Sequence, residues 1–152
     1  MLEIKFDNSH VSINDDSESK KSVLEKLASI LSGTTGIDAD IIFNKLYERE
    51  KLGSTSVGNG VALPHARLDG INMPFISVVV LEEAIDFDNI DDFDVDIIVC
   101  LIVPYDQTKD HLTLLSSLSQ ILDNISNRKK IRDSRNSEQI IASFKSGDLN
   151  YI

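Results

Sequence analysis

One stretch of the sequence carries more information than any other: Gly58–Ala66, which reads Gly-Asn-Gly-Val-Ala-Leu-Pro-His-Ala. It places a histidine directly after a short apolar strand that ends at a proline, beside a loop rich in glycine. Pro64 fixes its own φ at about −65° and favours extended geometry at Leu63, so the strand holds the imidazole in place. The open loop leaves room for a large partner. A histidine presented in this way suits nucleophilic attack and transient covalent modification of its ring.

The size and composition of the chain predict one globular domain over residues 1–152. Hydrophobic residues make up 41% of the chain, which is enough for one core, and the single cysteine, Cys100, lies in an apolar run where a buried side chain is expected. No apolar run reaches the roughly 20 residues of a membrane helix, so no direct membrane insertion is expected. The start of the chain lacks a signal-peptide pattern, which favours a cytoplasmic protein. A net charge of −10 argues against nucleic-acid binding.

Apolar periodicity predicts an α/β fold. Phe75–Leu81 and Val95–Val103 are rich in β-branched residues and indicate two central strands buried on both faces. A first helix is expected to begin at a cap on Ser17 or Ser19 and to stop at Gly33. The remaining predicted elements are short edge strands near the start of the chain, a helix from Asp38 to about Lys51, a strand at Val61–Leu63, and helices from about Asp110, over Asn127–Asp133 and over Ser137–Lys145. Helices interleaved with buried strands imply a single-domain sandwich, a mixed β-sheet flanked by helices on both faces.

The three histidines lie in different contexts. His10 belongs to a polar segment and is expected to be exposed and without a role. His65 follows a strand, and His111 opens a helix after another strand. Two histidines at neighbouring strand ends can share one pocket although they are far apart in sequence. From the pattern alone, ordinary surface or core histidines are the commoner outcome.

Other site chemistries fit the sequence poorly. A metal held by His65 and His111 would need a third ligand, and the acidic run over residues 86–96 lacks the regular spacing of a calcium loop. Gly58 is not followed by the Lys-Ser or Lys-Thr of a nucleotide-binding P-loop, and the loop precedes a strand. No Gly-x-Ser-x-Gly nucleophile motif is present. The sequence therefore predicts neither a metal nor a cofactor.

A family resemblance rests on three segments: Glu50–Ala66, Ser19–Lys21 and Pro104–Leu112. With them, roughly residues 10 to 145 resemble the mannitol/fructose-type IIA components of the bacterial phosphoenolpyruvate-dependent phosphotransferase system. Within this family, the sequence of these segments is most similar to the nitrogen-regulatory IIA branch. Ala66 departs from the glycine that many relatives carry. The resemblance implies the same sandwich architecture, and the segment Arg67–Ile71 is expected to form part of a docking rim.

The resemblance also assigns roles to residues. It implies that His65 is the phosphorylated nucleophile and that His111, Arg49 and Thr55 stabilise the phosphoryl group. Imidazole titrates near neutral pH, so a neutral ring nitrogen is available to attack phosphorus. Positioning and charge stabilisation supply most of the catalysis of phosphoryl transfer. Hydroxyl and amide groups of Ser54 and Thr55 are further candidate donors, and Arg49 can make a bidentate contact.

The implied function is a phosphoryl carrier that accepts phosphate from an HPr-type phosphocarrier protein and then controls regulatory target proteins, as in nitrogen and potassium regulation. Two alternatives stay open. A sugar-specific fructose or mannitol IIA would instead pass the phosphate to a IIB domain during uptake. A binding module without phosphoryl chemistry would keep only the fold, although the joint presence of Arg49, Thr55, His65 and His111 argues against it.

Overall fold

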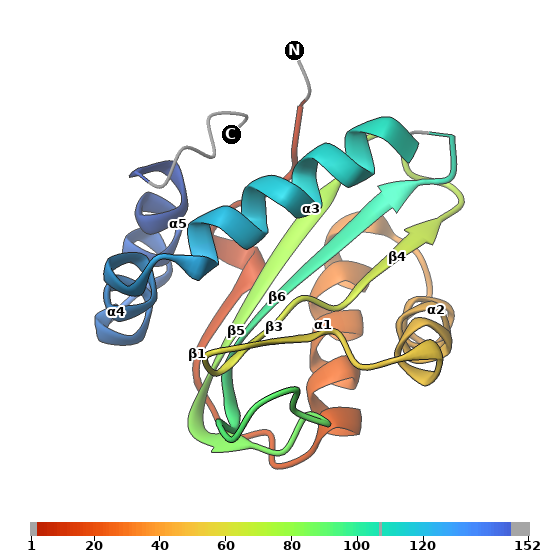
Figure 1. Ribbon diagram of the computed structural model, residues 1–152. Coiled ribbons are helices and arrows are strands. Elements are labelled where there is room, and N and C mark those ends of the chain that lie inside the picture. Colours follow the sequence, from red (N-terminus) through yellow and green to blue (C-terminus); the bar gives the residue numbers. More distant parts are fainter. Residues whose placement is uncertain (1–2, 107, 147–152) are drawn as a thin grey trace.

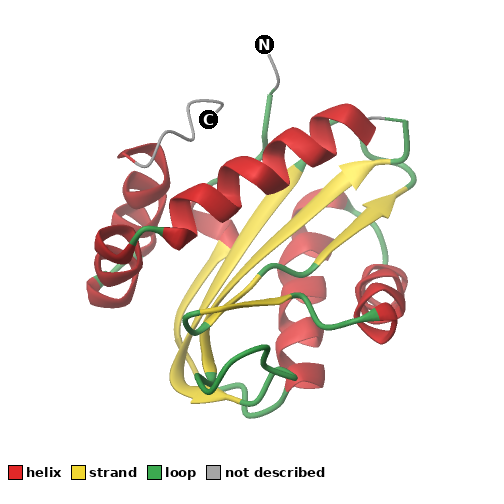
Figure 2. Cartoon of the chain, viewed as in Figure 1, coloured by secondary structure: helices red, strands yellow, loops and turns green. Residues whose placement is uncertain are grey.

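The computed structural model describes residues 3–106 and 108–146. All five helices that the periodicity predicts are present, and both long apolar runs form strands (Figures 1 and 2). In chain order the elements are η1 (Asn8–His10), β1 (Val11–Asp15), α1 (Lys20–Thr35), α2 (Ala39–Leu52), β2 (Ser56–Gly58), β3 (Val61–Ala62), β4 (His65–Leu68), β5 (Phe75–Ile85), β6 (Val95–Pro104), α3 (Thr108–Asp123), α4 (Ile125–Asp133) and α5 (Ser137–Ser146).

The strands form one mixed sheet with β5 and β6 at its centre. The order is β1-β5-β6-β3-β2, with β4 also paired to β6, and β5 and β6 run antiparallel to each other. Both β3 and β4 lie parallel to β6 along the same edge, Val61 opposite Ile97 and His65 opposite Leu101. These two short strands therefore form one extended segment along β6, and its pairing is interrupted at Pro64, which has no N–H to donate to the ladder.

Helices cover both faces of the sheet, as the sequence predicts. α1 and α2 lie on one face, and α3 runs across the other face, where α4 and α5 follow it (Figure 1). Successive side chains of a strand point to opposite faces, so β5 and β6 supply both cores. The core under α1 contains Leu24, Leu27, Val79 and Ile98, and the core under α3 contains Leu114, Leu118, Val78 and Val99.

The predicted end of the first helix is wrong by three residues. α1 begins after the predicted cap at Ser19, whose side chain accepts the backbone N–H of Ser22. It then continues through Gly33 and ends at Thr35. The residue that closes it is Gly36, whose φ of 75° lies in the left-handed region that glycine adopts readily. Gly33 is thus a helical residue, tolerated at a modest cost in stability.

The prediction that His10 is exposed is also wrong, because His10 is fully buried. Its Nδ1 lies 2.9 Å from the carbonyl oxygen of Ile76, and its Nε2 lies 2.9 Å from the hydroxyl of Thr34. A carbonyl only accepts, so Nδ1 carries the proton. The polar neighbours of His10 in the sequence hide this environment, which β5 and α1 create from distant positions.

Cys100 is buried in the central strand, as predicted. Of the short edge strands expected near the start of the chain, one is present as β1 at the edge of the sheet. The other is reduced to a single bridge between Lys5 and Phe75, and Leu2 lies outside the described residues. In the described part of the chain, no helix is long and apolar enough to cross a membrane.

Candidate functional site

The site is built around His65, the first residue of β4. Ala66 and Leu68 of this strand point into the core under α1 and α2. By alternation, the side chain of His65 points to the other face, the one that α3 covers. The strand pairing with β6, His65 opposite Leu101, fixes this orientation. His65 is only half-buried, so its ring is held by the sheet and still reachable from outside.

A backbone contact selects the reactive nitrogen of His65. Nδ1 lies 2.8 Å from the carbonyl oxygen of Leu63. Because a carbonyl only accepts, Nδ1 carries the hydrogen, and in the neutral ring the free lone pair is on Nε2. Burial lowers the pKa of His65, and the positive charge of Arg49 lowers it further, against an opposing contribution from the Leu63 hydrogen bond. The ring is therefore neutral and nucleophilic at neutral pH.

His111, near the start of α3, packs against His65. The two ring centroids are 5.4 Å apart and the ring planes meet at 82°. The structure thus brings together the two histidines that the family resemblance assigns to one site. His111 is buried, and its Nδ1 has no hydrogen-bond partner among the described residues. Burial lowers the pKa of His111 to about 4, with smaller contributions from His65 and Arg67, so this ring is also neutral at neutral pH.

Arg49 lies in the last turn of α2, beside the same site. Its Nη1 donates to the carbonyl oxygen of Gly53 at 2.8 Å. Among the described residues, its other guanidinium N–H groups have no hydrogen-bond partner, and its charge adds to the effect of burial in lowering the pKa of His65.

Next to Arg49, Glu50 organises the loop that leads to the site. Its carboxylate is buried and accepts both the backbone N–H of Thr55, at 3.2 Å, and the Thr55 hydroxyl. Lys20 of α1 lies 2.7 Å from the same carboxylate and also contacts Asp88. A buried charge needs such partners, because its desolvation is otherwise costly. The hydrogen of the Thr55 hydroxyl is thus used by Glu50.

The hydroxyl of Ser54 is likewise occupied by hydrogen bonds to main-chain groups. Its hydroxyl donates to the carbonyl oxygen of Phe87 at 2.8 Å and accepts the backbone N–H of Ser56 at 3.1 Å. Of the residues that the sequence selects, His65 and His111 are in contact, Arg49 lies within electrostatic range, and the hydroxyls of Ser54 and Thr55 are occupied by other groups.

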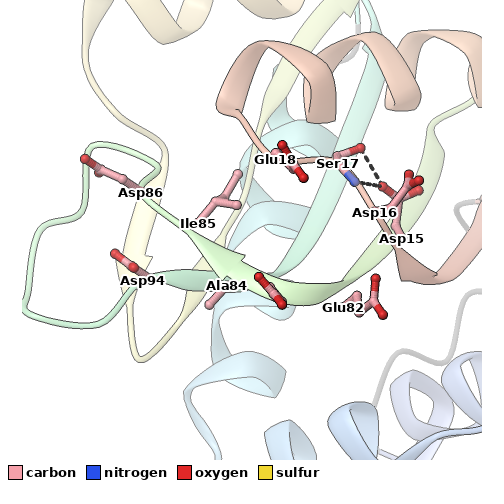
Figure 3. A pocket seen from close by; sticks show the side chains of 10 residues that line it. Asp15, Asp16, Ser17, Glu18, Glu82, Ala84, Ile85, Asp86 and Asp94 are labelled. Carbon is pink, nitrogen blue, oxygen red and sulfur yellow. Dashed lines mark hydrogen bonds between the residues drawn. The ribbon is translucent and has the colours of Figure 1, made fainter.

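An acidic pocket lies at the other end of the sheet, where β1 and β5 end and β6 begins (Figure 3). Its carboxylate-bearing residues are Asp15, Asp16, Glu18, Glu82, Glu83, Asp86 and Asp94. Such a lining repels anions, so this pocket does not suit phosphoryl chemistry. Among the described residues, no group of three or more His, Cys, Asp or Glu residues could hold a metal ion.

Comparison with known proteins identifies the family of the chain. Residues 5–147 match the family described as phosphoenolpyruvate-dependent sugar phosphotransferase system, EIIA 2. The chain belongs to this family. A relative named nitrogen regulatory protein, from Pseudomonas aeruginosa, is 39% identical over 139 residues, which are 89% of this chain and 90% of the relative.

Solved structures of the EIIA 2 type share the fold. The nitrogen regulatory protein IIA-Ntr from Neisseria meningitidis superposes with a TM-score of 0.87 at 31% identity, covering 91% of this chain and 94% of that one. The mannitol IIA of Escherichia coli, solved in complex with phosphorylated mannitol IIB, gives a TM-score of 0.80 at 14% identity, over 94% of this chain and 99% of that one. As a member of the EIIA 2 family, the chain is a component of a phosphotransferase system.

Two features of this EIIA 2 site are absent from the sequence-based selection. Glu50 lies in the last turn of α2, where the helix dipole disfavours a carboxylate. This unfavourable position is the signal in the sequence that could have indicated a special role for Glu50. The Leu63 carbonyl has no side-chain signature at all. Only the tertiary structure shows that it bonds the ring two residues further on.

Proposed function

We propose that the protein is a phosphoryl carrier of the nitrogen-regulatory IIA type and that Nε2 of His65 accepts the phosphoryl group from a phosphohistidine on an HPr-type carrier. The bond between Nε2 and phosphorus forms as the bond between phosphorus and the donor imidazole breaks, and the donor ring leaves with that electron pair. The observation that supports this most is the Leu63 hydrogen bond, which leaves the Nε2 lone pair free. The same carbonyl stabilises the positive charge that the ring gains on attack.

The neighbours of His65 support the proposal through charge. Neutral His111 can donate a hydrogen bond to a phosphoryl oxygen, and an arriving dianion favours its protonated form. Arg49 has guanidinium N–H groups to spare for a bidentate contact. The hydroxyls of Thr55 and Ser54 would have to turn away from Glu50 and the Phe87 carbonyl before they could contact the phosphoryl group.

The donor in this proposal is a protein because the surroundings of His65 offer an apolar surface. Leu52, at the end of α2, is 84% exposed, and Leu112, next to His111, is 65% exposed. Large apolar side chains that flank a reactive group are typical of a docking surface for another protein. The same surface suits a regulatory target, whose binding would change when the phosphoryl charge is added.

Relatives named nitrogen regulatory protein favour the regulatory role over sugar uptake. The sugar-specific alternative keeps some support, since the family description names a sugar system and the mannitol IIA of Escherichia coli forms a complex with its IIB. Both functions share the chemistry up to phosphorylated His65 and differ in the protein that receives the phosphoryl group or binds the carrier.

The test is phosphorylation of the purified protein by phosphoenolpyruvate, enzyme I and an HPr-type carrier. Wild type and His111→Ala should take up acid-labile label, the variant more slowly, whereas His65→Ala should take up none while its circular dichroism stays native. Label on His65→Ala at the wild-type level would overturn the assignment. Discharge of the labelled wild type by a IIB domain would favour the sugar-uptake alternative, and retention would favour regulation.

A further inference from the structure

Arg67 shares a strand face with His65. The two residues are separated by one position of β4, and the intervening Ala66 and the following Leu68 point into the opposite core. Residues two apart on a strand are neighbours on one face, about 6.6 Å along the chain. The register of β4 on β6, with Arg67 opposite Val103, confirms that the strand is regular through this pair. An arginine side chain is long enough to cross that spacing.

The ring of His65 is oriented so that its reactive edge lies on the Arg67 side. Nδ1 is directed back along the chain, to the carbonyl of Leu63. In an imidazole, the Cδ2–Nε2 edge is opposite Nδ1 across the axis of the Cβ–Cγ bond. Nε2 is therefore at the outer end of the ring, displaced in the forward direction of the strand, which is the direction of Arg67.

Arg67 is exposed, and its guanidinium has no partner among the described residues. In the described part of the chain, no carboxylate lies within salt-bridge range of it, and no hydrogen bond to its side chain is formed. Arg49, in contrast, donates to the Gly53 carbonyl. The charge of Arg67 also makes a minor contribution to the lowered pKa of His111, which packs against His65. A chain with a net charge of −10 offers many carboxylates, and among the described residues none of them pairs with Arg67.

We propose that Arg67 is a further catalytic residue, whose guanidinium hydrogen-bonds the oxygens of the phosphoryl group on Nε2 of His65. The role rests on the proposed function of His65. Guanidinium matches the geometry of a phosphoryl group and stays charged at every relevant pH. With Arg67 on the strand and Arg49 at the end of α2, the phosphoryl group lies between two cations that come from different elements.

The decisive measurement is the equilibrium constant for phosphoryl transfer between the HPr-type carrier and this protein, read from the fractions of both phosphorylated species at equilibrium. This constant compares free proteins, so contacts in the docked complex do not affect it. Three variants of the full chain are compared with wild type: Arg67→Gln, Arg67→Lys and Arg135→Gln. Arg135 is also exposed, and it serves as the control because it lies between α4 and α5.

We expect Arg67→Gln to lower the equilibrium constant by about tenfold or more, the loss of one charge-assisted hydrogen bond. Arg67→Lys should recover part of it, because the charge remains without the bidentate geometry, and Arg135→Gln should equal wild type. An unchanged equilibrium constant with slower transfer would overturn the inference and assign Arg67 to docking. Failure of wild type itself to accept phosphate would refute the proposed function instead.

Discussion

Protonation of His111 is expected to destabilise the fold at acid pH. Its pKa is about 4 in the folded protein, against about 6.5 in an unfolded chain. Between these values the unfolded state binds the proton and the folded state does not, so stability falls as the pH is lowered. At about 1.4 kcal/mol for each pH unit between the two values, the loss approaches about 3 kcal/mol. The stabilisation is fully present above about pH 6.5 and is lost below about pH 4.

The assay is urea denaturation of wild type and His111→Gln at several values between about pH 7.5 and about pH 4. Carboxylates and other histidines titrate in both proteins, so the difference between the two free energies of unfolding isolates His111. As the pH falls across this range, wild type should lose about 3 kcal/mol more of its free energy of unfolding than His111→Gln does. Two curves that stay parallel would show that the folded pKa of His111 is close to its ordinary value, and that burial does not keep this ring neutral.

Further predictions concern groups away from the phosphoryl chemistry. Glu50→Gln should lower the free energy of unfolding by about 3 kcal/mol, the low end for a broken buried ion pair because Asp88 still contacts Lys20. Urea denaturation measures this change. The control is Lys129→Met, which removes an exposed ion pair and should leave the free energy of unfolding measurably unchanged. Equal effects of the two substitutions would contradict the role of Glu50. Burial raises the pKa of the Cys100 thiol to about 12, so a thiol reagent at about pH 8 should react with unfolded protein only. Rapid reaction in the native state would contradict that burial.

Local patterns in the sequence predicted the elements well. Each central strand contains a run of mostly apolar residues, many of them β-branched, over Phe75–Leu81 and Ile97–Val103. α2 has an Asp38 cap and an apolar stripe, so both signals are present within short windows. The prediction for the end of α1 was wrong because either of two glycines, Gly33 or Gly36, could end the helix. Of these two, only Gly36 adopts the left-handed conformation that closes the helix.

The site was predicted less completely. The contact of His65 with His111 follows from strand ends and the family resemblance, but other contacts of the chain depend on pairs with no local pattern. Lys20 and Glu50 meet because α1 and α2 pack on one face of the sheet. His10 is buried because Ile76 and Thr34 satisfy its two nitrogens from far along the chain. Composition around a residue cannot show partners that only folding brings to it.

The Leu63 carbonyl has a consequence for the product of the proposed reaction. Histidine can form two phosphoramidate isomers, and here the choice between them is made by a main-chain oxygen rather than by a side chain. No amino-acid substitution at position 63 removes that oxygen. In the proposed reaction the choice of isomer therefore withstands any side-chain replacement at position 63, and a change of the side chains that meet the partner leaves this contact in place.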